Sequence, residues 1–298
     1  MTTIKKHVSS LMERLEFPMD AQKVFLDALD CISEDKVASA WLSRLIEQYD
    51  ESENCDYKQM LSDITALGEA LGIHKYTSGM LLFLCLAEKL RERYAEYGID
   101  ESIFYDSMAD LRYKLEECRL IHGIVGSFVC KWFKGFFNLT RFKLGRLQFE
   151  VVLTQKDYTL NGKTIPAGNK VINVHIPRTG TKLNHDEVLA SYKQASEMFA
   201  PEFEGSQMVF HCKSWMLDPW NLTVLSPTSN MALFLKDFEI VECCNYENYD
   251  GVWRLFDCLY IGDVSALPQD TSLRRAYANR IERGEPVAWG RGMFIYRD

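Results

Sequence analysis

The stretch "KVINVHIPRTGTKLNHDEVLASYKQASEMF", residues 170–199, predicts a strand, a loop and a helix in direct succession. The strand is closed by Pro177, which cannot continue a ladder. Asn184 is suited to cap the helix, and Glu187, three residues later, completes a capping-box pattern. A strand that leads through a loop into a helix indicates a sheet covered by helices.

The flanking sequence predicts the rest of a mixed sheet. "GRLQFEVVL", residues 145–153, alternates between apolar and polar side chains as a half-buried strand does. Asn161-Gly162 is a two-residue hairpin signal. Further elements are expected in this order: a strand at 206–215, a helix capped by Ser226 with Pro227 in its first position, strands near 238–244 and 253–260, a helix at 270–283, and a strand in "GMFIYR".

Residues 1–120 predict five or six helices packed as a bundle. "VASAWLSRLIEQ" repeats apolar residues at helical spacing, which predicts a core face of Val37, Trp41, Leu42, Leu45 and Ile46. "YTSGMLLFLCLAEKLRERYAEY" is apolar nearly all round at first, as a central buried helix is. We therefore expect an α+β chain in which an all-α domain, residues 1–120, precedes a mixed α/β domain, residues 121–298, with a boundary within 118–142.

Composition excludes several classes of protein. The chain has 34 basic and 42 acidic residues. Residues 1–120 hold 14 of the basic and 23 of the acidic residues, and residues 121–298 hold the other 20 basic and 19 acidic residues. Neither part has the large positive charge that would attract nucleic acid or an anionic membrane. The nine cysteines are scattered without a CxxC pair, which favours reduced thiols and a cytoplasmic location. No signal peptide is visible, and the longest apolar run is residues 80–87, far short of the roughly 20 that a membrane span needs.

Reactive residues crowd "FHCKSWMLDP", residues 210–219, but a strand separates them. Neighbouring side chains of a strand point to opposite faces, so His211 cannot act as the base for Cys212 or Ser214. This disfavours a hydrolase built on Cys212. Each of Cys212, Ser214 and Asp218 could still line a pocket alone.

Other familiar ligand sites are not predicted either. The six histidines form no i, i+4 pair, so we expect no metal. "GRG", residues 290–292, precedes a strand rather than a helix and fails the context of a dinucleotide loop.

A polar patch is the other candidate for chemistry. Arg146, Gln148 and Glu150 are expected on one strand face, and Asn173 and His175 on one face of the strand after the hairpin. If these strands pair, Glu150 or His175 could deprotonate an amine, directly or through water. The alternative is a solvated sheet face without catalytic function.

Several sequence segments together resemble a known family: "FKLGRLQFE", "VINVHIP", "FHCKSWMLDP", "SPTSNMALFLKDFEI" and "AYANRIERGEPVAWGRGMF". They are similar to the GNAT-like C-terminal domain of bacterial acyltransferase-domain proteins, which follows a helical N-terminal domain. The resemblance covers about residues 120–298. It implies transfer of an acyl group from acyl-coenzyme A, as small-molecule donor, to an unknown acceptor, which we expect to be an amine. The alternative is a binding or regulatory protein that keeps the fold and has lost transfer chemistry.

The resemblance also implies a donor site. In GNAT folds the coenzyme A pyrophosphate lies at the loop between a central strand and its helix, and the pantetheine arm lies between two splayed strands. The matching loop here offers Arg178, Gly180, Thr181 and Lys182. It departs from the usual [QR]xxGxG or [QR]xxGxA pattern. Asp186 and Glu187 in the first helical turn favour the alternative of a self-capped helix without a pyrophosphate.

Overall fold

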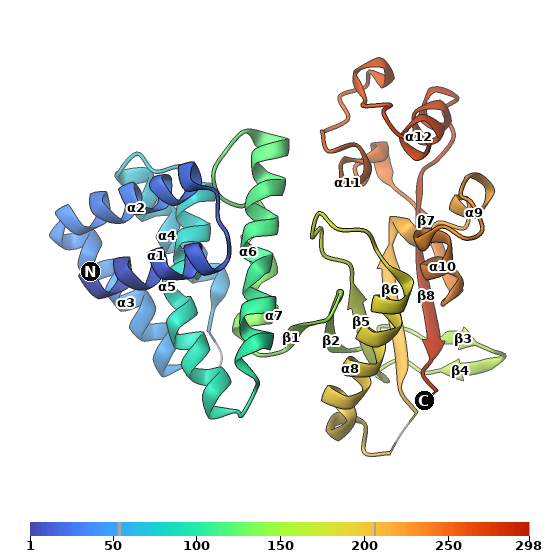
Figure 1. Cartoon of the computed structure of the whole chain (residues 1–298), viewed down its shortest axis with the longest axis horizontal. Helices are drawn as coiled ribbons and strands as arrows, with labels where there is room; N and C mark the ends of the chain where they lie inside the picture. The colour runs from blue at the N-terminus through green and yellow to red at the C-terminus, as the bar shows by residue number, and fades with distance from the viewer. Residues whose placement is uncertain (53–54, 206, 298) are drawn as a thin grey trace. The chain divides into compact units, whose positions relative to one another are not determined.

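The computed structural model describes residues 1–52, 55–205 and 207–297. The chain contains two compact units, Met1–Phe142 and Lys143–Asp298. The first unit is helical and the second carries a mixed sheet flanked by helices (Figure 1). The predicted class, an all-α region followed by a mixed α/β domain, is confirmed.

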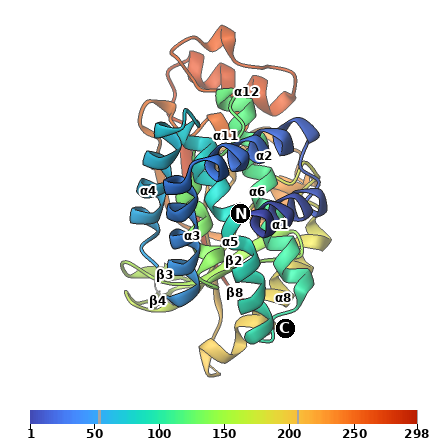
Figure 2. The same ribbon diagram turned by 90° about the vertical axis from the view of Figure 1, so that its left-hand side faces the viewer.

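The first unit is built around one buried helix. Residues 77–87, in the first half of α5 (Lys75–Glu96), are buried on every side, as their nearly unbroken apolar sequence predicts. The other α-helices of this unit, labelled in Figure 1, are α1 (Thr2–Arg14), α2 (Met19–Glu34), α3 (Lys36–Glu51), α4 (Tyr57–Ala70), α6 (Glu101–His122) and α7 (Lys134–Phe137). Figure 2 shows α1 to α6 from a second side. Among the described helices, none combines the length and apolar character needed to cross a bilayer.

One predicted helix face is wrong. In α3 the buried residues are Ala38, Leu42, Leu45 and Tyr49, whereas Val37 and Trp41 are exposed. The predicted face and the observed buried face share Leu42 and Leu45, so the spacing of apolar residues alone could not show which of the two is buried. Burial of Tyr49 decides the face, because its ring packs edge-on against Phe137.

The second unit is organised on a six-stranded sheet in the order β1-β2-β5-β6-β8-β7. Strand β5 is antiparallel to β2 and parallel to β6, while β8 is antiparallel to both β6 and β7. The strands are β1 (Arg141–Leu144), β2 (Leu147–Leu153), β5 (Lys170–His175), β6 (Val209–Ser214), β7 (Glu239–Asn245) and β8 (Ala288–Ile295). Ser206, the predicted start of β6, lies outside the described residues.

The two faces of this sheet have different covers. On one face Phe149, Phe210 and Phe294 pack with Tyr192 of α8 (His185–Phe203), the helix that Figure 1 shows along β5 and β6. On the opposite face, the hairpin of β3 (Tyr158–Leu160) and β4 (Lys163–Ile165) covers only one end, where its side chains join an apolar cluster with Val171, Val209 and Met293. The other end of that face is polar.

Two predictions in the last third of the chain are wrong. Residues 253–260 do not form a strand: α11 (Trp253–Phe256) is a short helix, and Val252 and Phe256, four apart, are both buried. Ser226 is not a helix cap, because α10 (Asn230–Lys236) begins later and is capped by Ser229, whose side chain accepts from the amide of Ala232.

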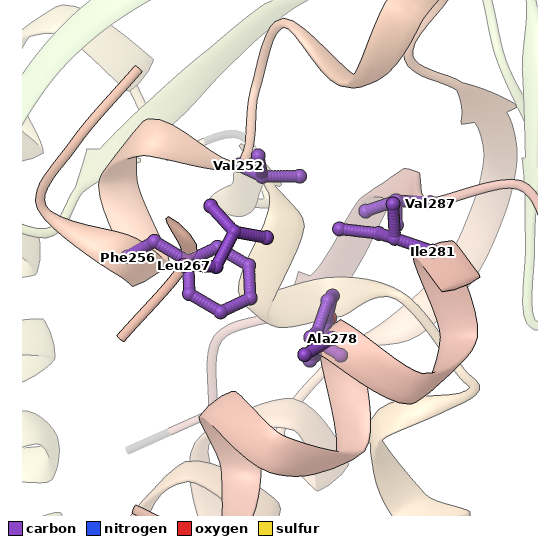
Figure 3. Packing of buried hydrophobic residues seen from close by; sticks show 7 residues of the cluster. Val252, Phe256, Leu267, Ala278, Ile281 and Val287 are labelled. Carbon is purple, nitrogen blue, oxygen red and sulfur yellow. The ribbon is translucent and has the colours of Figure 1, made fainter. Parts of the chain in front are cut away.

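A separate apolar cluster holds the last helices together. Side chains of α11, α12 (Ser272–Glu282) and the loops beside them point toward one another in Figure 3. The cluster consists of Val252, Phe256, Leu267, Tyr277, Ala278, Ile281 and Val287. It is tied to the end of β6 through the short helix α9 (Asn221–Val224), since the Tyr277 hydroxyl donates to Asn221 at 2.7 Å.

The "GRG" glycines lie inside β8, not before a strand as predicted. A Cβ added at Gly290 would lie 2.0 Å from the carbonyl oxygen of Leu217. Only a residue without a side chain allows this close backbone approach. The glycines therefore serve packing.

Replacing Gly290 by alanine is expected to destabilise the second unit by about 3 kcal/mol, because backbone must move to relieve the overlap. Gly284→Ala is the control: it has no atom within 4 Å of the added Cβ but a φ of +68°, which costs about 1 kcal/mol. Urea unfolding measures both. Equal losses in the two variants would contradict the packing role.

Candidate functional site

The polar end of the sheet face carries the candidate site. Register places Glu150 beside Asn173 and Asn173 beside His211, while Glu242 of β7 lies beside Arg291 of β8. Period-two alternation puts His175 on the same face as Asn173. Five strands thus contribute polar side chains to one surface.

Glu150 and His175 form a close pair. His175 Nε2 lies 2.7 Å from Glu150 Oε1, and their side chains are 21% and 15% exposed. The amide nitrogen of Asn173 lies 3.3 Å from Glu150 Oε1 and 3.0 Å from His175 Nε2. The strand pairing on which the predicted patch depended is therefore present, and Gln148 lies buried on the same face.

Arg146 does not belong to this patch, and that part of the prediction is wrong. It precedes β2 in a turn, where the amide of Arg146 donates to Ser191 of α8. Its guanidinium donates to the carbonyl oxygens of Pro177, Thr181 and Lys182, at 3.1 to 3.3 Å. Arg146 therefore fixes the loop between β5 and α8.

The bonds to Arg146 set the direction of the loop amides. In a planar trans peptide the C=O and N–H groups point in opposite directions, and the chain has no cis peptide bond. Because the carbonyls of Thr181 and Lys182 face Arg146, the N–H groups of Lys182 and Leu183 face away from it. In the described part of the chain these two amide hydrogens meet no acceptor.

The four predicted loop residues differ in whether their side chains already have partners within the chain. Arg178 forms an ion pair with Asp257, which also pairs with Arg274 at 2.5 Å. Gly180 has a φ of +78° and open space around it, and the Thr181 hydroxyl lies 2.8 Å from that of Thr179. Lys182 is exposed and has no ion-pair partner among the described residues. Lys182 is thus the cation of this loop that remains available for an anion.

The first turn of α8 is self-capped by Asn184, the cap that the sequence predicted. Asn184 Oδ1 accepts from the amides of Asp186 and Glu187, at 2.9 and 3.3 Å. These are the amides that a helix N-terminus would offer to an anion. Any phosphate bound here would therefore rely on the loop amides before Asn184.

The parallel strands β5 and β6 are paired over a short distance. Their register runs from Ile172↔Phe210 to Val174↔Cys212. His175 at the end of β5, and Lys213 and Ser214 at the end of β6, lie beyond the paired positions. The candidate pair and the Arg146-bound loop both lie at this end of β5.

The reactive residues of "FHCKSWMLDP" do not form a catalytic cluster. Cys212 is buried on the helix-covered face, and burial raises the pKa of its thiol to about 12. The Ser214 hydroxyl accepts from the amide of Met216, and Asp218 is ion-paired with Arg280 at 2.7 Å. Within the described residues, no group of three His, Cys, Asp or Glu is arranged to hold a metal ion.

His211, Arg291 and Glu242 were missed as members of the patch. His211 Nδ1 lies 2.8 Å from Asn173 Oδ1, His211 Nε2 lies 2.8 Å from an Arg291 nitrogen, and Arg291 Nε donates to Glu242 at 2.8 Å. Alternation in "VFHCKS" does place His211 on a polar face. Its position beside Asn173 required the strand order.

Three solved structures resemble the chain over nearly its whole length. An acyltransferase in complex with decanoyl-CoA gives a TM-score of 0.74 at 20% identity, covering 97% of this chain and 87% of that one. An acyltransferase with decanoyl-CoA and teicoplanin gives 0.72 at 21% identity and the same coverage. An acyltransferase mutant with octanoyl-CoA gives 0.75 at 21%, covering 98% and 88%. At these identities the likeness shows a shared fold.

Family models give the closer assignment. No curated protein sequence matches the chain. The N-acyltransferase N-terminal domain model matches residues 6–139, and the GNAT-like C-terminal domain model matches residues 141–294, more than half of the 298 residues. The chain therefore belongs to the family of proteins with a GNAT-like C-terminal domain, here preceded by an N-acyltransferase N-terminal domain.

Proposed function

We propose that this protein is an N-acyltransferase that moves an acyl group from acyl-coenzyme A to an amine on a small-molecule acceptor. One observation carries the proposal: the Glu150–His175 pair lies where β5 leads into the Arg146-bound loop. A base and a candidate phosphate site thus lie at one end of a single strand. Family membership and the shared fold with acyl-CoA-bound acyltransferases support it.

The donor site is proposed on the loop and between the strands. The amides of Lys182 and Leu183, with the Lys182 ammonium, would hold the pyrophosphate of coenzyme A. The pantetheine arm would enter beyond the paired part of β5 and β6. Gly180, Thr181 and Arg178 are proposed to shape this loop, with Arg178 kept in place by Asp257.

The proposed roles of the pair follow from its geometry. His175 donates its Nε2 hydrogen to the Glu150 carboxylate, so His175 Nδ1 holds the lone pair that takes a proton from the acceptor amine. The amine nitrogen forms a bond to the thioester carbonyl carbon, and the carbon–sulfur bond breaks. The proton taken by His175 then returns to the coenzyme A thiolate, so charge and atoms balance.

A second candidate function is a binding or regulatory protein without transfer chemistry. The self-capped first turn of α8 and the acidic Asp186 and Glu187 favour it, since they oppose an anion at the helix itself. The two candidates differ in whether the chain binds coenzyme A and turns it over.

Coenzyme A is expected to stabilise the second unit, whereas pantetheine, which lacks the phosphates, should bind more weakly. A ligand at one hundred times its Kd adds about 2.7 kcal/mol to the free energy of unfolding. Thermal unfolding with coenzyme A, octanoyl-CoA and pantetheine measures this. Thiol release from octanoyl-CoA, with an amino sugar, a polyamine and an amino acid as acceptors, measures turnover. Binding without turnover would favour the second candidate. An unchanged thermal midpoint at millimolar ligand would contradict the proposed pyrophosphate site on the loop and the proposed pantetheine site beyond the paired part of β5 and β6.

Lys182→Gln is expected to weaken coenzyme A binding about two- to fivefold, the range for one exposed ion pair, and to leave pantetheine binding unchanged. Lys193→Gln is the matched control, because Lys193 lies exposed on α8 and its one ion-pair partner in the described part of the chain is Glu197, at 3.9 Å. Calorimetric titration gives both constants. Equal affinities for coenzyme A in the two variants would remove Lys182 from the site.

A further inference from the structure

Beside the Glu150–His175 pair, three side chains that the proposed reaction does not use form a hydrogen-bonded row. Asn173 of β5, His211 of β6 and Arg291 of β8 are joined by two contacts of 2.8 Å. Arg291 is fixed from behind by Glu242, which in turn accepts from Lys156 at 2.7 Å. His211 is 7% exposed. Polar side chains at this burial cost free energy unless each is hydrogen-bonded.

The chemistry of these groups fixes every proton in the row. A guanidinium only donates hydrogen bonds, so His211 Nε2 must accept from Arg291. Burial, and next the adjacent Arg291 charge, lower the pKa of His211 to about 4, so the ring is neutral near pH 7. Its one hydrogen is therefore on Nδ1, which donates to Asn173 Oδ1. The Asn173 amide is thereby held with its NH₂ group toward Glu150 Oε1, to which it donates at 3.3 Å. Because His175 Nε2 donates to the same oxygen, the 3.0 Å contact between Asn173 Nδ2 and His175 Nε2 joins two donors and is not a hydrogen bond.

We propose that Asn173, oriented by His211 and Arg291, is a positioning residue for acyl transfer that donates an N–H to Glu150 Oε1, the oxygen that also accepts from His175 Nε2. This rests on the proposed function. A donor beside Glu150 stabilises its carboxylate form, so the hydrogen shared with His175 stays on His175 Nε2 and the lone pair stays on Nδ1. The row is not a proton relay, because Arg291 stays protonated and ends it.

Asn173→Asp tests this with the smallest change, since it keeps the oxygen that accepts from His211 and turns the donor into a carboxylate oxygen. The charged and titratable groups around it are Glu150, His175, His211, Lys213, Arg291, Glu242 and Lys156. A new negative charge beside His175 favours its protonated form. The acid limb of kcat/KM should therefore move to higher pH by about one unit, with recovery of activity in alkali.

The assay uses octanoyl-CoA and the best amine of the panel, with the same amine for every variant, so that titration of the amine cancels. Asn279→Asp, on the exposed face of α12, is the matched control and should keep the wild-type profile. If wild type transfers and Asn173→Asp shows an unshifted profile, or an equal loss at every pH, the inference is overturned while the proposed function stands. If wild type transfers nothing, the proposed function itself fails.

A second measurement does not depend on activity or on folding of a variant. In long-range ¹H–¹⁵N spectra of the wild-type chain, His211 is expected as the neutral Nδ1–H tautomer, unchanged between pH 6 and 8. An Nε2–H tautomer, or titration of His211 within that range, would contradict the orientation of Asn173 and overturn the inference.

Discussion

Replacing His175 by alanine is expected to lower kcat for acyl transfer by about 10²–10⁴-fold, the usual contribution of a general base, and to leave the fold intact. His175 is the last residue of β5 and is 21% exposed, so its removal opens no core cavity. The acceptor amine then has no group at this position to take its proton. Initial rates at saturating octanoyl-CoA measure the effect, and the thermal midpoint checks the fold.

Glu150→Gln is expected to lower the rate over the same range for a different reason. A glutamine amide can donate to His175 Nε2, which would leave the ring hydrogen on Nδ1 and so remove the base from the acceptor. The Glu150 carboxylate is thus proposed to fix the tautomer of His175, as a carboxylate hydrogen-bonded to a catalytic histidine does in other enzymes. Loss of the carboxylate should therefore be nearly as severe as loss of the ring.

His185→Ala provides the matched control. His185 lies 2.9 Å from Asp237, and their side chains are 23% and 16% exposed, close to the values for His175 and Glu150. The Tyr192 hydroxyl also donates to Asp237, which places this second pair on the helix-covered side of the sheet. Its loss should leave kcat unchanged. A wild-type rate in His175→Ala or Glu150→Gln would remove that residue from the mechanism.

Local signals predicted most elements of the second unit correctly. The Asn161-Gly162 hairpin, the β2 alternation and the Asn184 cap of α8 all follow from neighbouring residues. The prediction of a strand at residues 253–260 was wrong because their apolar pattern fits a short strand as well as a helical turn. The turn is chosen by packing of Val252 and Phe256 into a cluster with α12, far along the chain.

The candidate site was predictable only as far as local pairing reaches. Glu150, Asn173 and His175 lie on strands joined through one hairpin, so alternation was sufficient to group them. His211 and Arg291 reach the same surface through a parallel pair and a distant antiparallel strand. Strand order is a property of the whole sheet, and no short window of sequence contains it.

Arg280→Met is expected to destabilise the second unit by about 3–5 kcal/mol, the usual cost of leaving one member of a buried ion pair without its partner. Arg280 and Asp218 are 8% and 4% exposed, with a 2.7 Å contact. Asp218 also accepts from the amides of Trp220 and Ala288. Its carboxylate thus joins α12, the end of β6 and the start of β8, and methionine would preserve only the apolar stem.

Arg283→Met is the matched control, because Arg283 follows α12 directly and pairs with Glu285 at 2.6 Å, but on the surface. Its loss should cost less than about 1 kcal/mol. The double variant Asp218→Asn/Arg280→Met should recover part of the loss, since it leaves no buried charge unpaired. Urea unfolding, followed by tryptophan fluorescence and fitted separately for each unit, gives the three free energies. If Arg280→Met cost no more than Arg283→Met, packing of Tyr277 and Ile281 rather than the ion pair would hold α12 in place.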